Sequence, residues 1–189
     1  MKKVIEKIKD IDLQFFHKLR TYSVSQKTDI FLRLYIHLGD GYIWAMVIAY
    51  LIFFEGFEKF SVIIKAVAPA GFFSLAVYWI IKYLVKRKRP YDLLSGVNAK
   101  ISPLDRYSFP SGHTMNNLTL GFTLSYFMPQ IGGAIMILFI LMPLSWGLLR
   151  VYYGLHWLSD ILAGIVLAGL CLSLYFTYFF KLGCSLFPL

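Results

Sequence analysis

Three ionisable residues stand close together in the stretch Leu149–Asp160, among mainly apolar neighbours, and their spacing could support nucleophilic chemistry. Arg150 precedes His156 by six residues, and Asp160 follows His156 by four. A spacing of four places two side chains on one face of a helix. Asp160 could then accept a hydrogen bond from one ring nitrogen of His156 and leave the other nitrogen free to attack. This pair would be half of an active site.

A second set of polar residues could hold a phosphate group. Lys82, Arg89 and Arg150 offer charge-assisted donors, and an arginine can bind two oxygens at once. Ser111 adds a hydroxyl and is expected to stand at a helix start, where free N–H groups and the helix dipole favour an anion. Gly112 lets the backbone approach closely.

Two histidines could divide the labour of breaking a phosphoester. One of His113 and His156 would attack phosphorus, and the other would protonate the departing oxygen and later activate water.

The elements that position these residues are membrane helices. With 189 residues the chain suits a single domain, and its 58% hydrophobic residues and mean hydropathy of +0.64 exceed soluble-protein values. We therefore expect an all-α, multi-pass membrane helix bundle. The net charge of +9 does not indicate nucleic acid, because the cations cluster beside apolar segments; a phosphorylated lipid or an anionic membrane surface fits better.

Hydropathy predicts two parts and about five transmembrane helices. Residues 1–27 are expected to hold an amphipathic interfacial helix, a merely solvated helix being the alternative. Residues 28–189 are expected to be the membrane-embedded domain, because a bilayer core of roughly 30 Å needs about 20 apolar residues per helix. The expected spans are residues 28–54, 60–81, 111–128, 133–149 and 157–180, with Pro90 stopping the second helix.

With five crossings, one membrane face carries the end of the second and fourth spans and the start of the third and fifth. The polar residues named above all lie at those four points. Residues scattered over almost eighty positions are therefore expected to meet at one rim of the bilayer.

The chain resembles a known family, the type 2 phosphatidic acid phosphatases, or membrane lipid phosphate phosphatases. Three motifs carry the resemblance, and they span roughly residues 28–180 together with the predicted helices. The first motif, K-x6-R-P, is matched by Lys82, Arg89 and Pro90. The second, P-S-G-H, is matched by residues 110–113. The third, S-R-x5-H-x3-D, is matched from Arg150 onward, but Leu149 stands where the family usually has serine.

The resemblance implies a role for each matching residue. His156 would be the nucleophile that forms a phosphohistidine, Asp160 its orienting partner, and His113 the acid toward the leaving group. The phosphate oxygens would be held by Lys82, Arg89, Ser111, Gly112 and Arg150. No cofactor and no metal are implied, and the residues agree, because a two-metal phosphatase would need several carboxylates.

Five further polar residues have competing interpretations. His37 and Asp40 interrupt the first span and could be functional or a structural hydrogen-bond pair, the structural reading being preferred. Lys86, Arg87 and Lys88 are most simply contacts to lipid headgroups rather than catalytic groups.

The orientation in the membrane is indicated differently by two observations. Sixteen of the nineteen Lys and Arg residues lie on the face of the N-terminus and the expected site, and only Lys59, Lys65 and Lys181 lie on the other. The positive-inside rule would make the site face cytoplasmic. Bacterial relatives commonly work on the outer face of the cytoplasmic (inner) membrane, and we expect an outward-facing site there.

Three functional classes are compatible with the sequence. The first is hydrolysis of a lipid phosphate or diphosphate, such as undecaprenyl diphosphate, phosphatidylglycerol phosphate, phosphatidic acid or lipid A. The second is a lipid phosphotransferase using the same phosphohistidine. The third is a non-catalytic binder or transporter of phosphorylated lipid. A soluble haloperoxidase, which resembles the family at its oxyanion site, is excluded by the apolar spans.

Overall fold

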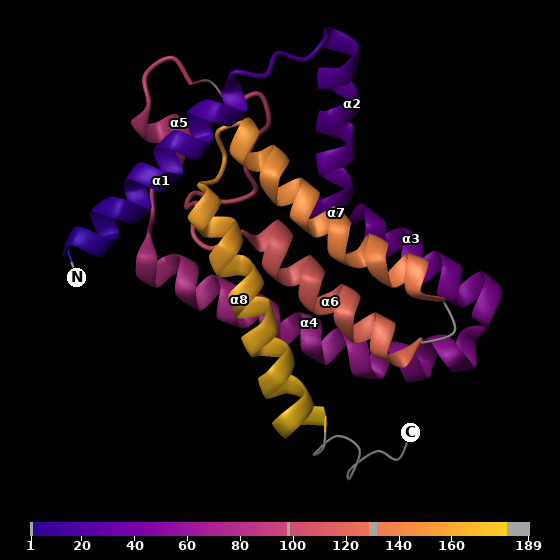
Figure 1. The fold of residues 1–189 in the computed structure, drawn as a ribbon. Coiled ribbons are helices and arrows are strands. Elements are labelled where there is room, and N and C mark those ends of the chain that lie inside the picture. Colours follow the sequence, from indigo (N-terminus) through magenta and orange to yellow (C-terminus); the bar gives the residue numbers. More distant parts are fainter. Residues whose placement is uncertain (1, 98, 129–131, 181–189) are drawn as a thin grey trace.

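The chain folds into a bundle of helices, and the computed structural model describes residues 2–97, 99–128 and 132–180 (Figure 1). No β-strand occurs in these ranges, as expected for the all-α class. The helical elements are α1 (Lys2–Arg20), α2 (Gln26–His37), η1 (Leu38–Tyr42), α3 (Ile43–Tyr50), η2 (Leu51–Glu55), α4 (Phe57–Val85), α5 (Pro90–Leu93), α6 (Gly112–Phe127), α7 (Gly132–Tyr152), α8 (Leu158–Leu174) and η4 (Tyr175–Phe180). The expected turn between the third and fourth spans falls on residues 129–132, mostly outside the described ranges.

Helix α6 is the centre of the bundle, packed against α4, α7 and α8 (Figure 1). Its buried polar side chains are satisfied within the protein: Thr119 Oγ1 donates to the carbonyl of Met115 at 3.0 Å, and Thr123 Oγ1 to that of Thr119 at 2.8 Å. Because neighbouring helices cover it, α6 does not need an apolar surface.

Three stretches are long and apolar enough to cross a membrane, namely Gln26–Glu55, Phe57–Leu93 and Leu158–Tyr178. Residues 137–152 of α7 form a shorter apolar helix, and α6 is both short and polar, which is the physical reason that five spans do not stand out by hydropathy. The protein is thus an all-α integral membrane protein, and within the described residues three helices are long and apolar enough to span a bilayer.

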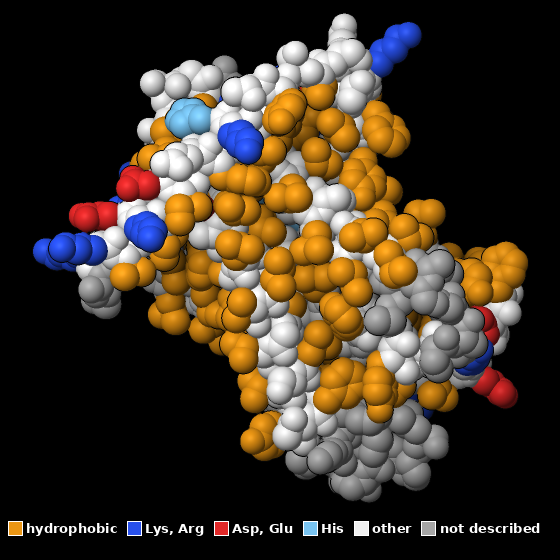
Figure 2. Space-filling model, in the orientation of Figure 1, with side chains coloured by type: hydrophobic (Ala, Val, Ile, Leu, Met, Phe, Trp, Pro, Cys, Tyr) orange, Lys and Arg blue, Asp and Glu red, His pale blue; other side chains and the backbone are white. Residues whose placement is uncertain are grey.

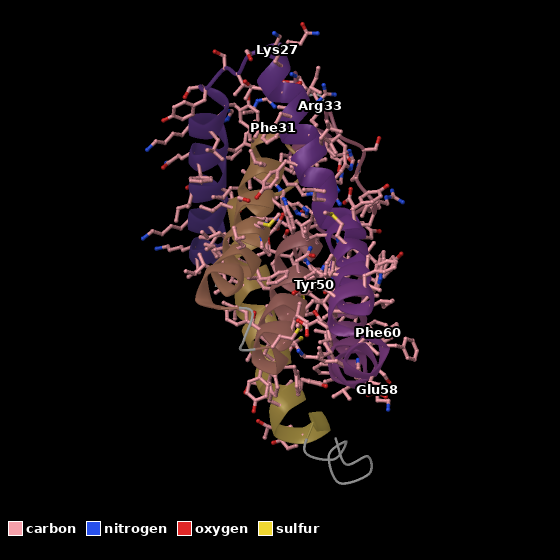
Figure 3. All side chains as sticks on the ribbon, turned by 90° about the vertical axis from the view of Figure 1, so that its right-hand side faces the viewer. Lys27, Phe31, Arg33, Tyr50, Glu58 and Phe60 are labelled. Atoms are coloured by element: carbon pink, nitrogen blue, oxygen red, sulfur yellow. The ribbon has the colours of Figure 1, made fainter. Side chains whose placement is uncertain are left out.

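The first of these stretches, Gln26–Glu55, is a helical rod of 30 residues with a kink at η1, so that α2 and α3 run in different directions (Figure 1). Figure 3 shows Lys27 and Arg33 toward one end of the rod and Glu58 just past the other, with Tyr50 between them. The rod is distorted at η1, where Gly41 has a φ of 123° that favours glycine.

Helix α4 ends at Val85, five residues before Pro90, which was expected to stop it. Lys86 adopts the left-handed conformation (φ 50°) and closes the helix with a hydrogen bond from its N–H to the carbonyl of Lys82. Pro90 instead begins the short helix α5, a position in which proline is favoured because its missing N–H is not needed. The prediction for Pro90 was therefore wrong in detail.

Apolar side chains cover much of the surface of the bundle. Figure 2 shows hydrophobic side chains across the middle of one face, with charged side chains near its margins. The large apolar residues with the most exposed side chains include Phe31, Leu34, Phe53, Phe54, Phe57, Phe72 and Leu84. Such a large exposed apolar area is typical of a lipid-facing surface.

Candidate active site

The residues singled out from the sequence come from four segments that meet on one side of the bundle: the end of α4, the start of α6, the end of α7 and the start of α8 (Figure 1). Four of them, Gly112, His113, Arg150 and His156, line a single cavity of about 250 Å³. His113, Arg150 and His156 are almost fully buried. The structure thus brings together both histidines and one arginine that lie up to 43 positions apart in the sequence.

His156 lies in the loop between α7 and α8, and Asp160 lies in the first turn of α8. The Nδ1 atom of His156 is 3.5 Å from Oδ2 of Asp160, and this oxygen also accepts the backbone N–H of Trp157 at 2.8 Å. The second contact fixes the carboxylate as a helix cap, so that it stays turned toward the imidazole. Burial lowers the pKa of His156 to about 3, so the ring is neutral and able to act as a nucleophile at ordinary pH.

His113 is in the first turn of α6 and faces a carboxylate from the distorted segment η1. Its Nε2 is 2.7 Å from Oδ1 of Asp40, at an angle poor for a hydrogen bond. The same oxygen accepts from Nη2 of Arg150 at 2.9 Å, and Oδ2 lies 2.6 Å from Nδ1 of His37. Asp40 therefore forms the structural pair with His37 that was preferred from the sequence, but it also contacts both His113 and Arg150 at the cavity.

Lys82 and Arg89 do not line the cavity. Both bind the carboxylate of Asp105, in the loop before α6. Oδ1 of Asp105 accepts from Lys82 Nζ at 2.6 Å and from Arg89 Nη2 at 2.7 Å. Its Oδ2 accepts from the hydroxyl of Tyr78 at 2.5 Å. Burial alone would raise the pKa of Asp105, but the hydrogen bonds from Lys82 and Tyr78 and the charge of Arg89 keep it below its usual value.

The two cations are held further by backbone carbonyls. Lys82 Nζ donates to the carbonyl of Tyr107 at 2.8 Å, and Arg89 donates to the carbonyls of Leu155 and Tyr107 at 2.6 and 2.9 Å. Asp105 lines the cavity, whereas Lys82 and Arg89 do not. An anion in the cavity would thus meet this carboxylate before it reached Lys82 and Arg89.

The start of α6 differs from the expectation in two ways. The backbone N–H of Ser111 donates to the carbonyl of Asp160 at 3.1 Å, so this donor is not free for an anion. Gly112 does line the cavity, but a Cβ there would lie 2.8 Å from the ring of Tyr78, so the close approach that requires glycine is to this ring. Ser111 Oγ accepts from Thr114 Oγ1 at 3.2 Å.

Arg87 was assigned to headgroup contacts from the sequence, and that assignment was wrong. Its Nη1 donates to Oδ1 of Asp160 and to Oγ of Ser159, both at 2.6 Å. Its side chain is therefore partly buried and bonded to the protein next to the candidate dyad. The neighbouring Lys86 and Lys88 side chains are exposed, as expected.

Leu149, which replaces the usual serine of the third motif, does not line the cavity. It packs against an apolar cluster that contains Ile36, Ile101 and Leu155. The departure from the motif is thus accommodated as a packing residue.

Apolar side chains line the cavity as well as charged ones. Leu75, Trp79, Leu104 and Leu120 line it together with the amides of two asparagines, Asn116 and Asn117. Asn117 is held by three hydrogen bonds, accepting from Trp44 Nε1 and donating to the carbonyls of Gly39 and His113. Such a mixed lining suits a molecule with an anionic end and an apolar end.

Among the described residues, no group of three or more His, Cys, Asp or Glu side chains is arranged to hold a metal ion. The residues that the sequence interpretation did not assign to the site are Asp40, Tyr78, Arg87, Asp105 and Asn117. Only Asp40 gave a signal in the sequence, as an ionisable residue between two glycines within an apolar span.

Comparisons with known proteins give a consistent result. The family model of the PAP2 superfamily matches residues 61–184. The undecaprenyl-diphosphatase of Sulfolobus acidocaldarius is 28% identical over 131 residues, which make up 69% of this chain and 61% of that protein. The chain thus spans about three fifths of the length of this relative.

Two solved structures have a similar fold. Aquifex aeolicus LpxE superposes with a TM-score of 0.70 and 26% identity, covering 88% of this chain and 94% of that one. A transmembrane PAP2 type phosphatidylglycerolphosphate phosphatase from Bacillus subtilis gives a TM-score of 0.67 with 20% identity, covering 93% and 87%. At that identity the second likeness concerns the fold alone.

Proposed function

This chain belongs to the PAP2 superfamily, and from that premise we propose that it is a membrane lipid phosphatase that removes phosphate from a lipid phosphate or diphosphate. The observation that carries the proposal is the cavity shared by His113, Arg150 and His156. Each imidazole faces a carboxylate: His113 Nε2 faces Asp40, and His156 Nδ1 faces Asp160. Arg150 adds a buried cation at the same cavity, and two oriented imidazoles beside an arginine suit the transfer of a phosphoryl group.

The proposed division of labour follows the geometry at the two histidines. Since Nδ1 of His156 faces Asp160, Nε2 is the atom available to attack phosphorus. His113, held between Asp40 and the cavity, is placed to protonate the leaving oxygen. The phosphate oxygens are assigned to Arg150, Gly112, Ser111, Lys82 and Arg89, the last two after Asp105 has moved aside.

The reaction proceeds in two displacements. In the first, a bond forms between His156 Nε2 and phosphorus, the bond from phosphorus to the lipid oxygen breaks, and His113 gives that oxygen a proton. In the second, water attacks phosphorus, His113 takes its proton, and the bond to Nε2 breaks. Asp160 balances the positive charge that the phosphorylated imidazole carries between the two steps.

The substrate is proposed from chemistry and from the relatives. The apolar residues that line the cavity, such as Leu75, Trp79 and Leu104, suit a lipid whose phosphate reaches the charged residues. Undecaprenyl diphosphate is placed first because a relative is named for it. Phosphatidylglycerol phosphate, phosphatidic acid and lipid A share the required group and form the rest of the substrate panel.

The arrangement in the membrane is part of the proposal. Five helical segments, the rod Gln26–Glu55 and helices α4, α6, α7 and α8, would cross the bilayer, with α1 at its interface. Exposed apolar residues on α1, including Val4, Ile5 and Ile8, support the interfacial position. We place the protein in the cytoplasmic membrane of a bacterium with the cavity facing outward.

Purified protein in detergent, assayed for phosphate release from the four lipids with EDTA and no added metal, tests the proposal. We expect turnover of at least one lipid, and a loss of several powers of ten in His156→Ala. A phosphotransferase would transfer the group to an added lipid hydroxyl instead of releasing phosphate. A non-catalytic binder would bind lipid both as the wild type and as His156→Ala, and neither protein would release phosphate. That result would overturn the proposal.

A further inference from the structure

Helix α1 carries a buried carboxylate on an otherwise exposed helix. Only Asp12 and Phe16 of its residues are buried, Asp12 with 1% of its surface exposed. Asp12 contacts Ser159 of α8, and Phe16 packs with Val151 of α7 and Ile161 of α8. Helix α1 lies against these two helices (Figure 1). A buried carboxylate is costly unless it is paired and hydrogen-bonded.

The partners of Asp12 lead directly to the candidate dyad. Its Oδ2 accepts from Nη2 of Arg87 at 2.6 Å, and the other terminal nitrogen of the same guanidinium donates to Oδ1 of Asp160 at 2.6 Å. Oδ2 of Asp160 then faces Nδ1 of His156 at 3.5 Å. One arginine thus bridges a carboxylate of α1 to the carboxylate that faces the nucleophile.

A second set of contacts fixes α1 to the start of α8. The backbone N–H of Ser159 donates to Oδ1 of Asp12 at 2.8 Å, and its hydroxyl donates to Oδ2 at 2.6 Å. The same hydroxyl accepts from Arg87 Nη1 at 2.6 Å. Asp12 therefore acts as a cap for α8 supplied by another helix, next to the capping carboxylate of Asp160.

We propose that Asp12 and Arg87 are positioning residues for His156, so that helix α1 is a working part of the active site. The inference rests on the proposed function, in which His156 accepts the phosphoryl group. Both oxygens of Asp160 are held from the side, one by Arg87 and the other by the Trp157 N–H, which aims the carboxylate at the imidazole.

The charges along this chain of contacts suit the reaction. Asp12, Arg87 and Asp160 together carry one net negative charge, which can balance the positive imidazole that exists while phosphorus is bound to Nε2. Loss of Arg87 would leave two buried carboxylates without their shared cation. Loss of the Asp12 charge would leave the guanidinium free to turn away from the geometry that holds Asp160.

The test compares Asp12→Asn and Arg87→Gln with Lys88→Gln, a matched loss of charge at the adjacent exposed position. Turnover is measured per folded protein, with the lipid of the panel that the wild type hydrolyses fastest. We expect kcat to fall about 100-fold in Arg87→Gln and about 10-fold or more in Asp12→Asn, with KM within a factor of about two. Lys88→Gln should match the wild type.

Two further readouts separate positioning from a merely structural role. Arg87→Lys, which keeps the charge but not the fork of donors, should recover part of the lost kcat. The double variant Asp12→Asn with Arg87→Gln should lose no more than Arg87→Gln alone, because both residues act through one carboxylate. The nearly isosteric Asp12→Asn supplies the test on its own if Arg87→Gln cannot be recovered folded.

The outcomes distinguish this inference from the function on which it rests. If the wild type hydrolyses lipid phosphate and His156→Ala does not, but Asp12→Asn and Arg87→Gln turn over like Lys88→Gln, the inference is wrong and the proposed function stands. A change confined to KM, or losses that add in the double variant, would also overturn it. If the wild type releases no phosphate from any lipid, both fall.

Discussion

Replacing Asp105 by alanine would remove the internal anion that Lys82 and Arg89 share. Both cations are 1% exposed, so the substitution leaves two buried positive charges without their carboxylate. Breaking a buried ion pair costs about 3–5 kcal/mol. At about 2–4 °C per kcal/mol for a chain of this size, we expect Tm to fall by about 6–20 °C.

Phosphate should restore much of that loss, because the anion would now reach the two cations directly. At 100 times its dissociation constant a ligand adds about 2.7 kcal/mol, or about 5–11 °C on the same scale. In the wild type the gain should be smaller, since phosphate must first displace Asp105. Thermal unfolding in detergent, with and without phosphate at matched ionic strength, measures both quantities.

Asp10→Ala is the matched control, since this carboxylate on α1 is exposed and should leave Tm within about 1 °C. The reasoning would be refuted if Asp105→Ala melted within about 2 °C of the wild type. It would be refuted equally if phosphate raised Tm by the same amount in both proteins.

Other substitutions test the positions of the two histidines. A Cβ at Gly39 would lie 2.7 Å from both His113 Cδ2 and Trp146 Cε3, so Gly39→Ala should lower the free energy of unfolding by about 1–3 kcal/mol and kcat by at least about tenfold. Gly169→Ala is the control, because a Cβ there meets no atom within 4 Å, and its kcat should be unchanged. Equal kcat values in the two variants would contradict this geometry. Asp40→Asn should lower kcat about 10–100-fold in the phosphate-release assay, because His113 and Arg150 lose the charge that holds both, and wild-type kcat would exclude that role. The folded pKa of about 3 for His156 lies below its unfolded value of about 6.5, so the stability that the neutral imidazole gives above pH 6.5 is lost as the pH falls. The free energy of unfolding should drop by about 2 kcal/mol between pH 7 and pH 5 in the wild type, and His156→Asn should lack this drop. Parallel pH curves of unfolding for the two proteins would contradict the neutral imidazole.

The sequence allowed much of the site to be predicted, because hydrophobic spans fix which helix ends share a membrane face. His113, Arg150 and His156 meet at one cavity for this reason, although they belong to three segments. Asp160 does face His156, but a turn of helix does not set this contact as the spacing suggested, because His156 lies in the loop before α8.

What could not be predicted depends on loops and irregular helix. Asp105 reaches Lys82 only through the path of the segment between α5 and α6, which has no periodicity to reveal it. Asp40 points at His113 because η1 is distorted at Gly41. Arg87 can turn inward because α4 stops at Val85, which the position of Pro90, five residues later, did not reveal.

The central helix was expected at residues 111–128, close to the observed bounds of α6, although its hydropathy is weak. Residues such as Asn117 and Thr119 make α6 too polar to stand out as a span, because the surrounding helices shield it from lipid. The polar character that weakens the hydropathy signal is what places amide groups beside the cavity.

The most direct test of transfer through His156 is the stereochemistry at phosphorus. A lipid phosphorothioate made chiral with oxygen isotopes would be hydrolysed by the wild-type protein in the presence of EDTA, and the configuration of the released thiophosphate determined by NMR. Two successive in-line displacements, first by His156 and then by water, predict net retention. Net inversion would mean that water attacks the lipid phosphate directly, and it would contradict the account.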